Sequence, residues 1–274
     1  MNKIIWSVYY SATGTTKKIV NRVADKLAEE LSAERKSYDF TRPFNRGEII
    51  SFNHNDVVIF GSPVYAGRIP NLMLKYISSI EGNGAFVVPI VLFGNRAYDD
   101  GLIEIRDILE SNNFHTIAAA AFVGQHSFSK VIAKGRPDSS DLNIADKFSF
   151  QISEKICTLK SGVEIKPIKV PGVASPYRGY FKPNNGNGSF IDIRKVKPLT
   201  FSSCDDCKLC AETCPMGAID FNDPTLIIGI CIKCCACIKV CPHSAKYFDD
   251  VDFLYHVRDL ELKLTTRASV ELFL

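Results

Sequence analysis

Eight of the chain's ten cysteines form two copies of one pattern. Each copy reads Cys-x2-Cys-x2-Cys-x3-Cys-Pro, and the first begins at Cys204 and the second at Cys231. Because all four positions keep one constant offset, the segment is expected to be an internal repeat, each half being a cysteine loop followed by a short helix. The eight residues are Cys204, Cys207, Cys210, Cys214, Cys231, Cys234, Cys237 and Cys241.

This spacing is that of the ligands in two-cluster bacterial ferredoxins. Three thiolates close in sequence can bind three irons of one cubane, and the fourth, which precedes a proline, crosses to the other cluster in this class of fold. We therefore predict one [4Fe–4S] cluster on Cys204, Cys207, Cys210 and Cys241, and a second on Cys231, Cys234, Cys237 and Cys214. The alternative is a pair of zinc sites, which would not need the third cysteine and the Cys-Pro at matching positions in both halves.

Two cysteines fall outside the pattern. Cys235 lies among the ligands but out of register, so we interpret it as a buried bystander. Cys157 is expected to be a small core residue on a helix. Ten cysteines in a secreted chain would suggest disulfides, but this spacing indicates metal ligation in a reducing compartment. We therefore expect a cytoplasmic protein.

The first half of the chain alternates apolar strands with amphipathic helices. Strands are expected at 4–10, 35–40, 56–61, 85–93 and 117–123, and the last helix at 142–159. Five such units predict an α/β fold, a doubly wound parallel five-stranded sheet whose ligand lies beyond the carboxyl ends of the strands.

Three unusual loops follow these strands, at 11–16, 62–70 and 94–99, and should meet at that edge. The first is rich in hydroxyls and opens a helix, which suits a phosphate, because N–H groups at a helix N-terminus and short hydroxyls both donate hydrogen bonds. It lacks the lysine of a nucleoside-triphosphatase loop and the three glycines of a dinucleotide site, so a monophosphate fits better. The alternative is an ordinary Ser/Thr helix cap. Tyr65 and Tyr98, in the other two loops, are suited to stacking on a flat ring.

These features together resemble the flavodoxin–ferredoxin fusion proteins of anaerobic prokaryotes. Ser11-x-Thr13-Gly14-x-Thr16 looks like the FMN-phosphate signature of flavodoxins, and the Gly61-Ser-Pro-Val-Tyr-Ala-Gly67 and Phe93-Gly-Asn-Arg-x-Tyr98 loops and the paired cysteine runs extend the match over the chain. The resemblance implies a flavodoxin-like FMN domain, a smaller α+β ferredoxin domain with two [4Fe–4S] clusters, and a role in electron transfer.

The resemblance also assigns the cofactor-binding residues by position. It implies that the phosphate is bound by Ser11, Ala12, Thr13, Gly14, Thr15 and Thr16. It also implies that two loops lie on either side of the isoalloxazine ring. One consists of Ser62, Pro63, Val64, Tyr65, Ala66 and Gly67, and the other of Gly94, Asn95, Arg96, Ala97 and Tyr98. His126, which follows the last strand of the sheet, either borders the flavin or is an ordinary hydrogen-bonded histidine.

We expect four regions: a flavodoxin-like FMN domain at 1–160, a basic Pro/Gly-rich linker at 161–198, a ferredoxin domain at 199–249, and a C-terminal helix with an apolar tail at 250–274. Residues 160–198 contain eight Lys or Arg against two Asp or Glu. Such runs are usually solvated; the alternative is that Arg178, Lys182 or Arg194 face the anionic clusters or a partner.

The composition narrows the possible partners. The formal charge of +3 describes the chain without its cofactors, and bound clusters and a flavin phosphate would make it negative, so nothing favours nucleic acid. No apolar run approaches the ~20 residues of a spanning helix. We expect redox partner proteins, no membrane span, and a possible homodimer.

The leading hypothesis is a relay of electrons between the two clusters and FMN, and on to or from an unidentified redox partner. The main alternative is an FMN-dependent reductase of a small oxidant, fed by its own ferredoxin module. A redox sensor or docking module without turnover is a third class. We find no Ser/His/Asp or Cys/His arrangement for nucleophilic catalysis and no NAD(P)H motif.

Overall fold

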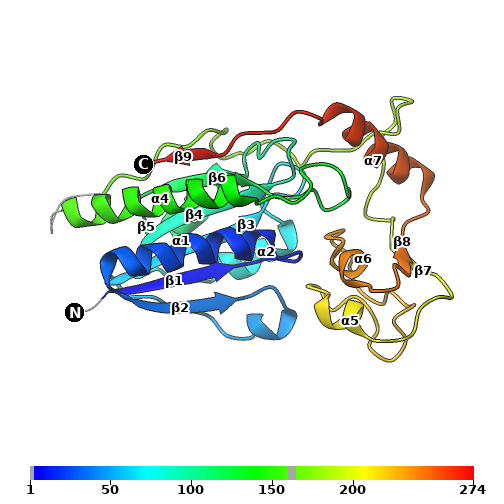
Figure 1. Cartoon of the computed structure of the whole chain (residues 1–274), viewed down its shortest axis with the longest axis horizontal. Coiled ribbons are helices and arrows are strands. Elements are labelled where there is room, and N and C mark those ends of the chain that lie inside the picture. The colour runs from blue at the N-terminus through cyan, green and yellow to red at the C-terminus, as the bar shows by residue number, and fades with distance from the viewer. Residues whose placement is uncertain (1–2, 160–164) are drawn as a thin grey trace.

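A mainly parallel β-sheet, together with the helices packed on it, forms the larger part of the molecule (Figure 1). The structure is a computed structural model that describes residues 3–159 and 165–274. The expected boundary at 160/161 and residues 1–2 lie outside the described residues. The main strands are β1 (Ile4–Tyr9), β2 (Glu34–Asp39), β3 (Asp56–Pro63), β4 (Phe86–Phe93) and β6 (Ala119–Val123). They pair in the order β2-β1-β3-β4-β6, all parallel, which confirms the predicted fold class.

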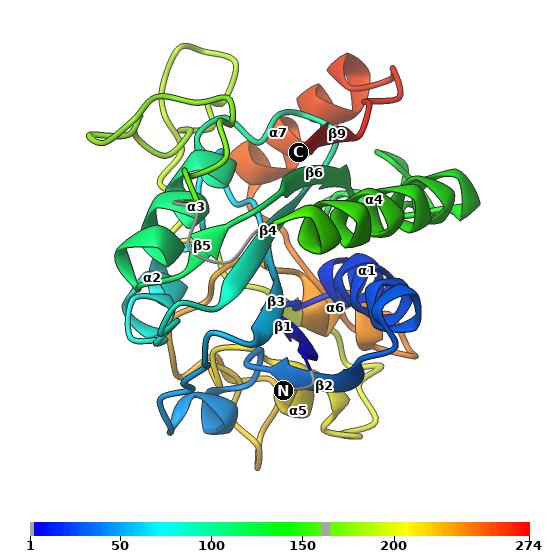
Figure 2. The same ribbon diagram turned by 90° about the vertical axis from the view of Figure 1, so that its left-hand side faces the viewer.

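Helices cover both faces of the sheet. Figure 2 shows α2 (Asn71–Ile77) and α3 (Gly101–Ser111) on one face and α1 (Thr15–Leu31) and α4 (Ser139–Thr158) on the other. Each face has its own apolar core, because the central strands are buried on both sides and present side chains alternately to the two layers. A short 3-10 turn, η1 (Pro43–Arg46), follows β2. Cys157, expected in the core, is exposed on α4 instead.

Two strands extend the sheet beyond the five that were expected. The very short β5 (His115–Thr116) pairs with β4. The C-terminal β9 (Glu271–Phe273) adds to the edge as an antiparallel partner of β6. The apolar tail therefore covers an otherwise open sheet edge, and both ends of the chain belong to the same sheet.

The cysteine repeat folds into a small unit beyond the carboxyl ends of the parallel strands (Figure 1). Its helices α5 (Leu209–Thr213) and α6 (Ala236–Val240) are separated by the same offset as the cysteines. The left-handed residues repeat too: Asp206 and Lys233 have φ of 60° and 57°, and Lys208 and Cys235 have φ of 62° and 58°. Strands β7 (Leu199–Thr200) and β8 (Lys246–Tyr247) pair antiparallel across its ends.

The C-terminal segment returns from this unit to the sheet. This segment begins with helix α7 (Val251–Lys263), whose N-terminus is capped by Asp250. The Asn95 side chain donates hydrogen bonds to the carbonyls of Leu264 and Thr266 at 3.2 and 2.8 Å and accepts one from the Ala268 N–H at 3.0 Å. Arg136, in a buried ion pair with Asp141, donates to the Ala268 carbonyl, and the Arg267 side chain pairs with Asp138.

No helix within the described ranges is both long and apolar enough to cross a bilayer.

Asn95→Ala tests whether this attachment stabilises the fold. The substitution leaves two carbonyls and one N–H without their partner, so we expect the free energy of unfolding to fall by about 1–3 kcal/mol. Urea denaturation measures the change, and amide exchange at residues 271–273 should accelerate. Asn187→Ala, on an exposed loop, is the control; equal effects of the two substitutions would contradict the prediction.

Candidate functional site

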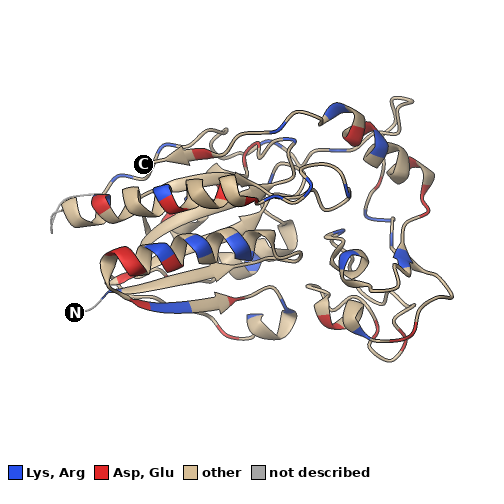
Figure 3. Cartoon of the chain, in the orientation of Figure 1, with Lys and Arg blue, Asp and Glu red and all other residues tan. Residues whose placement is uncertain are grey.

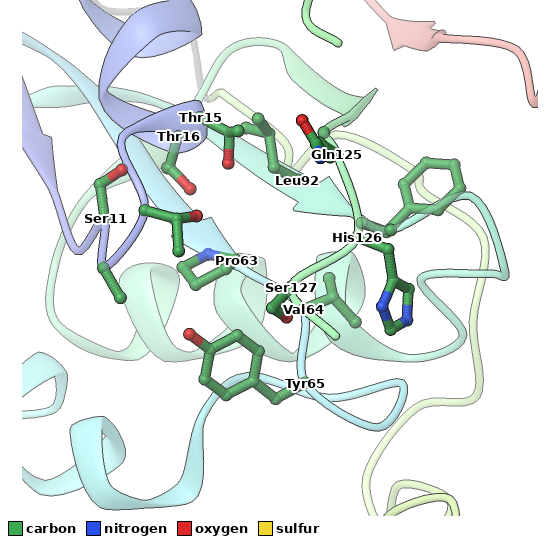
Figure 4. Close-up of a pocket in the computed structure, with 15 residues that line it drawn as sticks. Ser11, Thr15, Thr16, Pro63, Val64, Tyr65, Leu92, Gln125, His126 and Ser127 are labelled. Atoms are coloured by element: carbon green, nitrogen blue, oxygen red, sulfur yellow. The ribbon is translucent and has the colours of Figure 1, made fainter. Parts of the chain in front are cut away.

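A small pocket lies at the N-terminus of α1, where the first predicted loop ends (Figure 4). Its volume is about 60 Å³. Gly14 has a φ of 86° and precedes the helix, and having no side chain it cannot cap the first N–H groups. The loop is fixed by two hydrogen bonds: the Ser11 N–H donates to Thr41 Oγ1 at 2.8 Å, and Ser11 Oγ accepts from the Lys17 N–H at 3.0 Å.

The side chains around this pocket are neutral. Those that line it include Ser11, Ala12, Thr13, Thr15, Thr16, Pro63, Val64, Tyr65 and Gly94 from the three predicted loops. Figure 4 shows the hydroxyls of Thr15 and Thr16 directed into the space and the Tyr65 ring closing one side. A helix N-terminus surrounded by hydroxyls fits a phosphate without a neighbouring lysine. The residues present therefore fit the phosphate end of a flavin mononucleotide.

The small pocket adjoins a much larger cavity, of about 790 Å³. Val64, Tyr65, His126 and Ser127 line both. The larger cavity also takes walls from the linker, from α7 and from the cysteine-rich unit: Gly179 to Pro183, Phe190 to Arg194, Ile232, Lys233, His256 and Leu260. Its size lies within the range of cofactor and ligand sites, so the ring of a flavin has room beside its phosphate pocket.

The loop at 62–67 is held by the linker. Its positive φ values, 52° at Ala66 and 82° at Gly67, form a tight turn. The Phe181 N–H donates to the Ala66 carbonyl at 2.9 Å, and the Tyr180 hydroxyl donates to the Ile69 carbonyl at 2.8 Å. The linker thus follows the surface of the sheet domain.

The loop at 94–98 lies differently from the expectation. Gly94 lines the small pocket and Arg96 the large cavity, but Asn95 binds the C-terminal segment and the Tyr98 hydroxyl donates to Glu271 of β9 at 2.8 Å. Ala97 lines neither space. The structure therefore brings only part of this loop to the cavity, because the returning C-terminal segment takes the rest.

A fourth loop, Gly124 to Ser127, lines the pocket after β6. Sequence reasoning singled out only His126 there, although the position after a parallel strand was a signal for the whole loop. Burial, and then the positive charge of Lys239, lower the pKa of His126 to about 4, so its ring is neutral at neutral pH. Its Nδ1 accepts from the Phe128 N–H at 3.1 Å, which leaves the proton on Nε2.

The cysteines surround two separate cavities. One is lined by Cys204, Cys207, Cys210 and Cys241. The other is lined by Cys214, Cys231, Cys234 and Cys237, and also by Cys235. Apart from Cys235, the two cavities divide the cysteines into the same two sets as the sequence prediction, each with its fourth member from the opposite half. The Ala218 N–H donates to Cys214 Sγ at 3.3 Å, and the Ala245 N–H, at the equivalent position of the second half, donates to Cys241 Sγ at 3.2 Å.

Cys235 occupies the position of Lys208 in the first repeat, directly before the short helix. Its thiol is buried, and the nearest polar partner is the Lys233 carbonyl at 3.7 Å. Burial raises the pKa of this thiol well above its usual range, so it stays protonated. Its backbone role, a left-handed residue before a helix, is the same as that of Lys208.

The cysteine-rich unit touches the sheet domain on the side of the second cysteine set. Arg46 Nη2 donates to the Pro215 carbonyl at 2.8 Å, and Lys239 Nζ donates to the His126 carbonyl at 3.2 Å. Met216 packs against the core of the sheet domain. Ile232 and Lys233 line both the second cysteine cavity and the large cavity, so these two spaces share a wall.

Among the three basic linker residues, Arg178 binds the Asp100 carboxylate at 3.0 Å. This ion pair holds the pKa of Asp100 well below its usual range. Arg178 therefore does not face the cysteine cavities. Lys182 and Arg194 line the large cavity.

Comparison with known proteins agrees with the division of the chain into a sheet domain and a cysteine-rich unit. The family described as "Flavodoxin domain" matches residues 7–85, and the family described as "4Fe-4S binding domain" matches residues 199–220. No curated protein matches the chain. Among solved structures, an archaeal flavodoxin is 13% identical, with a TM-score of 0.40, over 57% of this chain and 99% of its own. Flavodoxin 1 from Bacillus cereus is 14% identical, with a TM-score of 0.42, over 58% of this chain and 99% of its own.

The ligand register is tested with two neighbouring cysteines. Cys234→Ser should lower the iron content from about eight to about four atoms per chain, because each cubane uses four thiolates. Cys235→Ser should keep the full iron content. Iron and sulfide analysis of anaerobic preparations measures both. Cluster loss in Cys235→Ser with retention in Cys234→Ser would show that the register is wrong, and zinc in place of iron would favour the alternative site.

Proposed function

We propose that this protein, in which a flavodoxin domain is joined to a 4Fe–4S ferredoxin-type domain, relays electrons between two [4Fe–4S] clusters and FMN. The two domains by themselves make it an electron-transfer flavo-iron–sulfur protein. The observation that carries the relay is the wall, Ile232 and Lys233, shared by the second cysteine cavity and the large cavity. When bound, the clusters pass single electrons and the flavin holds one or two.

The shape of the site, a small pocket beside a larger cavity, supports FMN as the cofactor. One small hydroxyl-lined pocket on one helix N-terminus suits a single phosphate, and the adjoining cavity suits the ring. Tyr65 lies on both, and its hydroxyl has a pKa raised well above the usual range by burial, so it remains a neutral donor. The residues proposed to hold FMN are those of 11–16 and 63–66, with Gly94, Arg96 and the loop 124–127. Ser62 and Gly67, which the sequence also predicts, line neither space.

The support for two clusters is the repeat itself. Both halves have the same left-handed residues, the same short helix and the same N–H donation to a cysteine sulfur. Such hydrogen bonds stabilise the negative charge of a reduced cluster and so raise its potential. We propose the two crossed sets of four cysteines as the ligands.

The same large cavity also supports a second candidate, an FMN-dependent reductase of a small oxidant. Its volume exceeds what the ring of a flavin needs, and Arg96, Lys182 and Arg194 on its walls would orient an anionic molecule. In that case the ferredoxin domain would supply the electrons, and the substrate would enter beside the linker.

We propose redox proteins as partners and a cytoplasmic location, which the cluster ligation supports. The proposed limits stay as expected from the sequence, with FMN domain 1–160, linker 161–198, ferredoxin domain 199–249 and C-terminal region 250–274. The last region in addition supplies strand β9 to the first.

Thr13→Val combined with Thr16→Val tests the phosphate pocket. Hydrogen bonds to charged groups contribute about 1.5–3 kcal/mol each, so the loss of two hydroxyl donors should raise the Kd for FMN by about a hundredfold or more. Fluorescence titration of the flavin-free protein measures it. Thr158→Val, on the exposed end of α4, is the control. An unchanged affinity in the double variant would contradict this location for the phosphate.

The relay is tested by following flavin reduction after rapid reduction of the clusters. Because both groups belong to one chain, the rate constant should not depend on protein concentration. Lys239→Met removes the hydrogen bond to the His126 carbonyl and should slow the step while both cofactors stay bound. Arg46→Met removes the hydrogen bond to Pro215 together with those to the Phe40 and Thr41 carbonyls, and should also slow it. Arg42→Met, an exposed neighbour, should not.

Transfer that is second order in protein would contradict the relay. If the transfer is fast and first order, the next observation is how the reduced flavin is oxidised. Oxidation that occurs only after a small anionic oxidant is added would favour the reductase.

A further inference from the structure

The two cysteine sets differ in how far solvent reaches them. In the first set, Cys207 is exposed and Cys204 and Cys241 are partly exposed. The fourth member of the first set, Cys210, is buried. In the second set no cysteine is exposed: Cys234 and Cys237 are buried and Cys214 and Cys231 are partly exposed. The wall of its cavity at Ile232 and Lys233 also lines the large cavity. Within the described residues, the first cysteine cavity shares no lining residue with the large cavity. The first set therefore points away from the flavin site.

We propose that the surface around the first cysteine set is the docking site for the external redox partner, and that this partner is a one-electron carrier protein with a basic contact face. The inference rests on the proposed relay. One electron crosses per encounter between the partner's centre and the first cluster, with no bond or proton transferred, and the second cluster connects to the flavin.

The surface has the composition of a transient protein interface. Phe201, Leu209 and Phe221 are large apolar side chains that are 50%, 39% and 56% exposed, and Leu209 also lines the first cysteine cavity. Such side chains around an exposed ligand cysteine give a partner close approach to the cluster.

The charge of this surface is negative. The first half of the repeat, residues 199–223, has five Asp or Glu and one Lys, whereas the second half, residues 226–250, has two Asp and three Lys. Asp205, Asp206, Asp220 and Asp223 belong to the first half, and Figure 3 shows acidic segments near α5 and a basic one at α6. Lys246 of the second half lines the first cysteine cavity, but it is buried there and donates to Thr200 and Pro224.

Equivalent positions of the repeat carry opposite charges. Asp206 corresponds to Lys233, and Glu212 corresponds to Lys239. Lys233 and Lys239 are used inside the molecule, donating to the carbonyls of Arg194 and His126 at 3.0 and 3.2 Å. These two lysines of the second half are thus bound to the linker and the flavodoxin domain. The carboxylates of the first half are left at the surface, although Asp206 also pairs with Lys208, and an acidic surface is complementary to a basic partner.

The test uses the holoprotein, reduced anaerobically with dithionite and freed of excess reductant, with cytochrome c as a basic one-electron acceptor. Asp206→Lys combined with Asp223→Asn changes the charge by +3; the lysine is the residue of the equivalent position, and the asparagine keeps the turn acceptor. We expect the second-order rate constant at low salt to fall about tenfold and its salt dependence to weaken, as for steered association.

Glu30→Lys combined with Glu154→Gln makes the same charge change on exposed helices far from the clusters and should alter the rate constant less than twofold. Iron content and flavin spectra establish that both variants are loaded. Cluster-to-flavin transfer, measured separately by its independence of protein concentration, reports on the relay itself. An unchanged rate in the Asp206/Asp223 variant, or an equal fall in the control, would overturn the docking site even where the internal transfer is intact.

Discussion

The attachment of the C-terminal segment to the flavodoxin sheet is the constraint on which the rest of the molecule depends. Strand β9 pairs with β6, and Asn95, Arg136 and Arg267 hold the residues before it. The ferredoxin unit is consequently an insertion between two neighbouring strands of one sheet, with a chain connection on each side. Two connections restrict its motion far more than one linker, because both ends of the inserted segment are fixed.

The linker, like the C-terminal segment, is attached to the flavodoxin domain. Its basic composition suggests a solvated connector, but Arg178 binds the buried Asp100, and Phe181 and Tyr180 bind carbonyls of the loop beside the cavity. The entropy of ordering this segment is opposed by an ion pair to a buried carboxylate and by hydrogen bonds to the backbone. A preformed wall of this kind would border the ring of a flavin in the proposed site without requiring a lid that closes.

The local parts of the structure could be predicted from the sequence, and the parts that depend on distant contacts could not. Apolar runs predicted four of the five parallel strands, and the position after the first helix predicted β2, whose sequence is polar. The constant offset of the cysteines predicted the equivalence of α5 and α6. The use of Asn95 and Tyr98 to bind the C-terminal segment had no local signal, since their partners lie near the opposite end of the chain. The same holds for the walls at Ile232 and Leu260. A strand as short as β5 cannot be marked by any periodicity.

The buried lysine between the two domains links the fold to the proposed chemistry. Lys233 is 8% exposed, and its ammonium group donates to the carbonyls of Arg194 and Cys231 at 3.0 and 2.9 Å. A buried positive charge with only neutral acceptors is unfavourable. Lys233 lies on the wall between the second cysteine cavity and the large cavity. The Asp192 carboxylate, which also lines the large cavity, attracts its charge, and a cluster with four thiolates would supply further negative charge. If the proposed cluster and flavin lie on the two sides of that wall, the same positive charge would stabilise an added electron on either of them, so the residue that completes the interface would also favour their reduced forms.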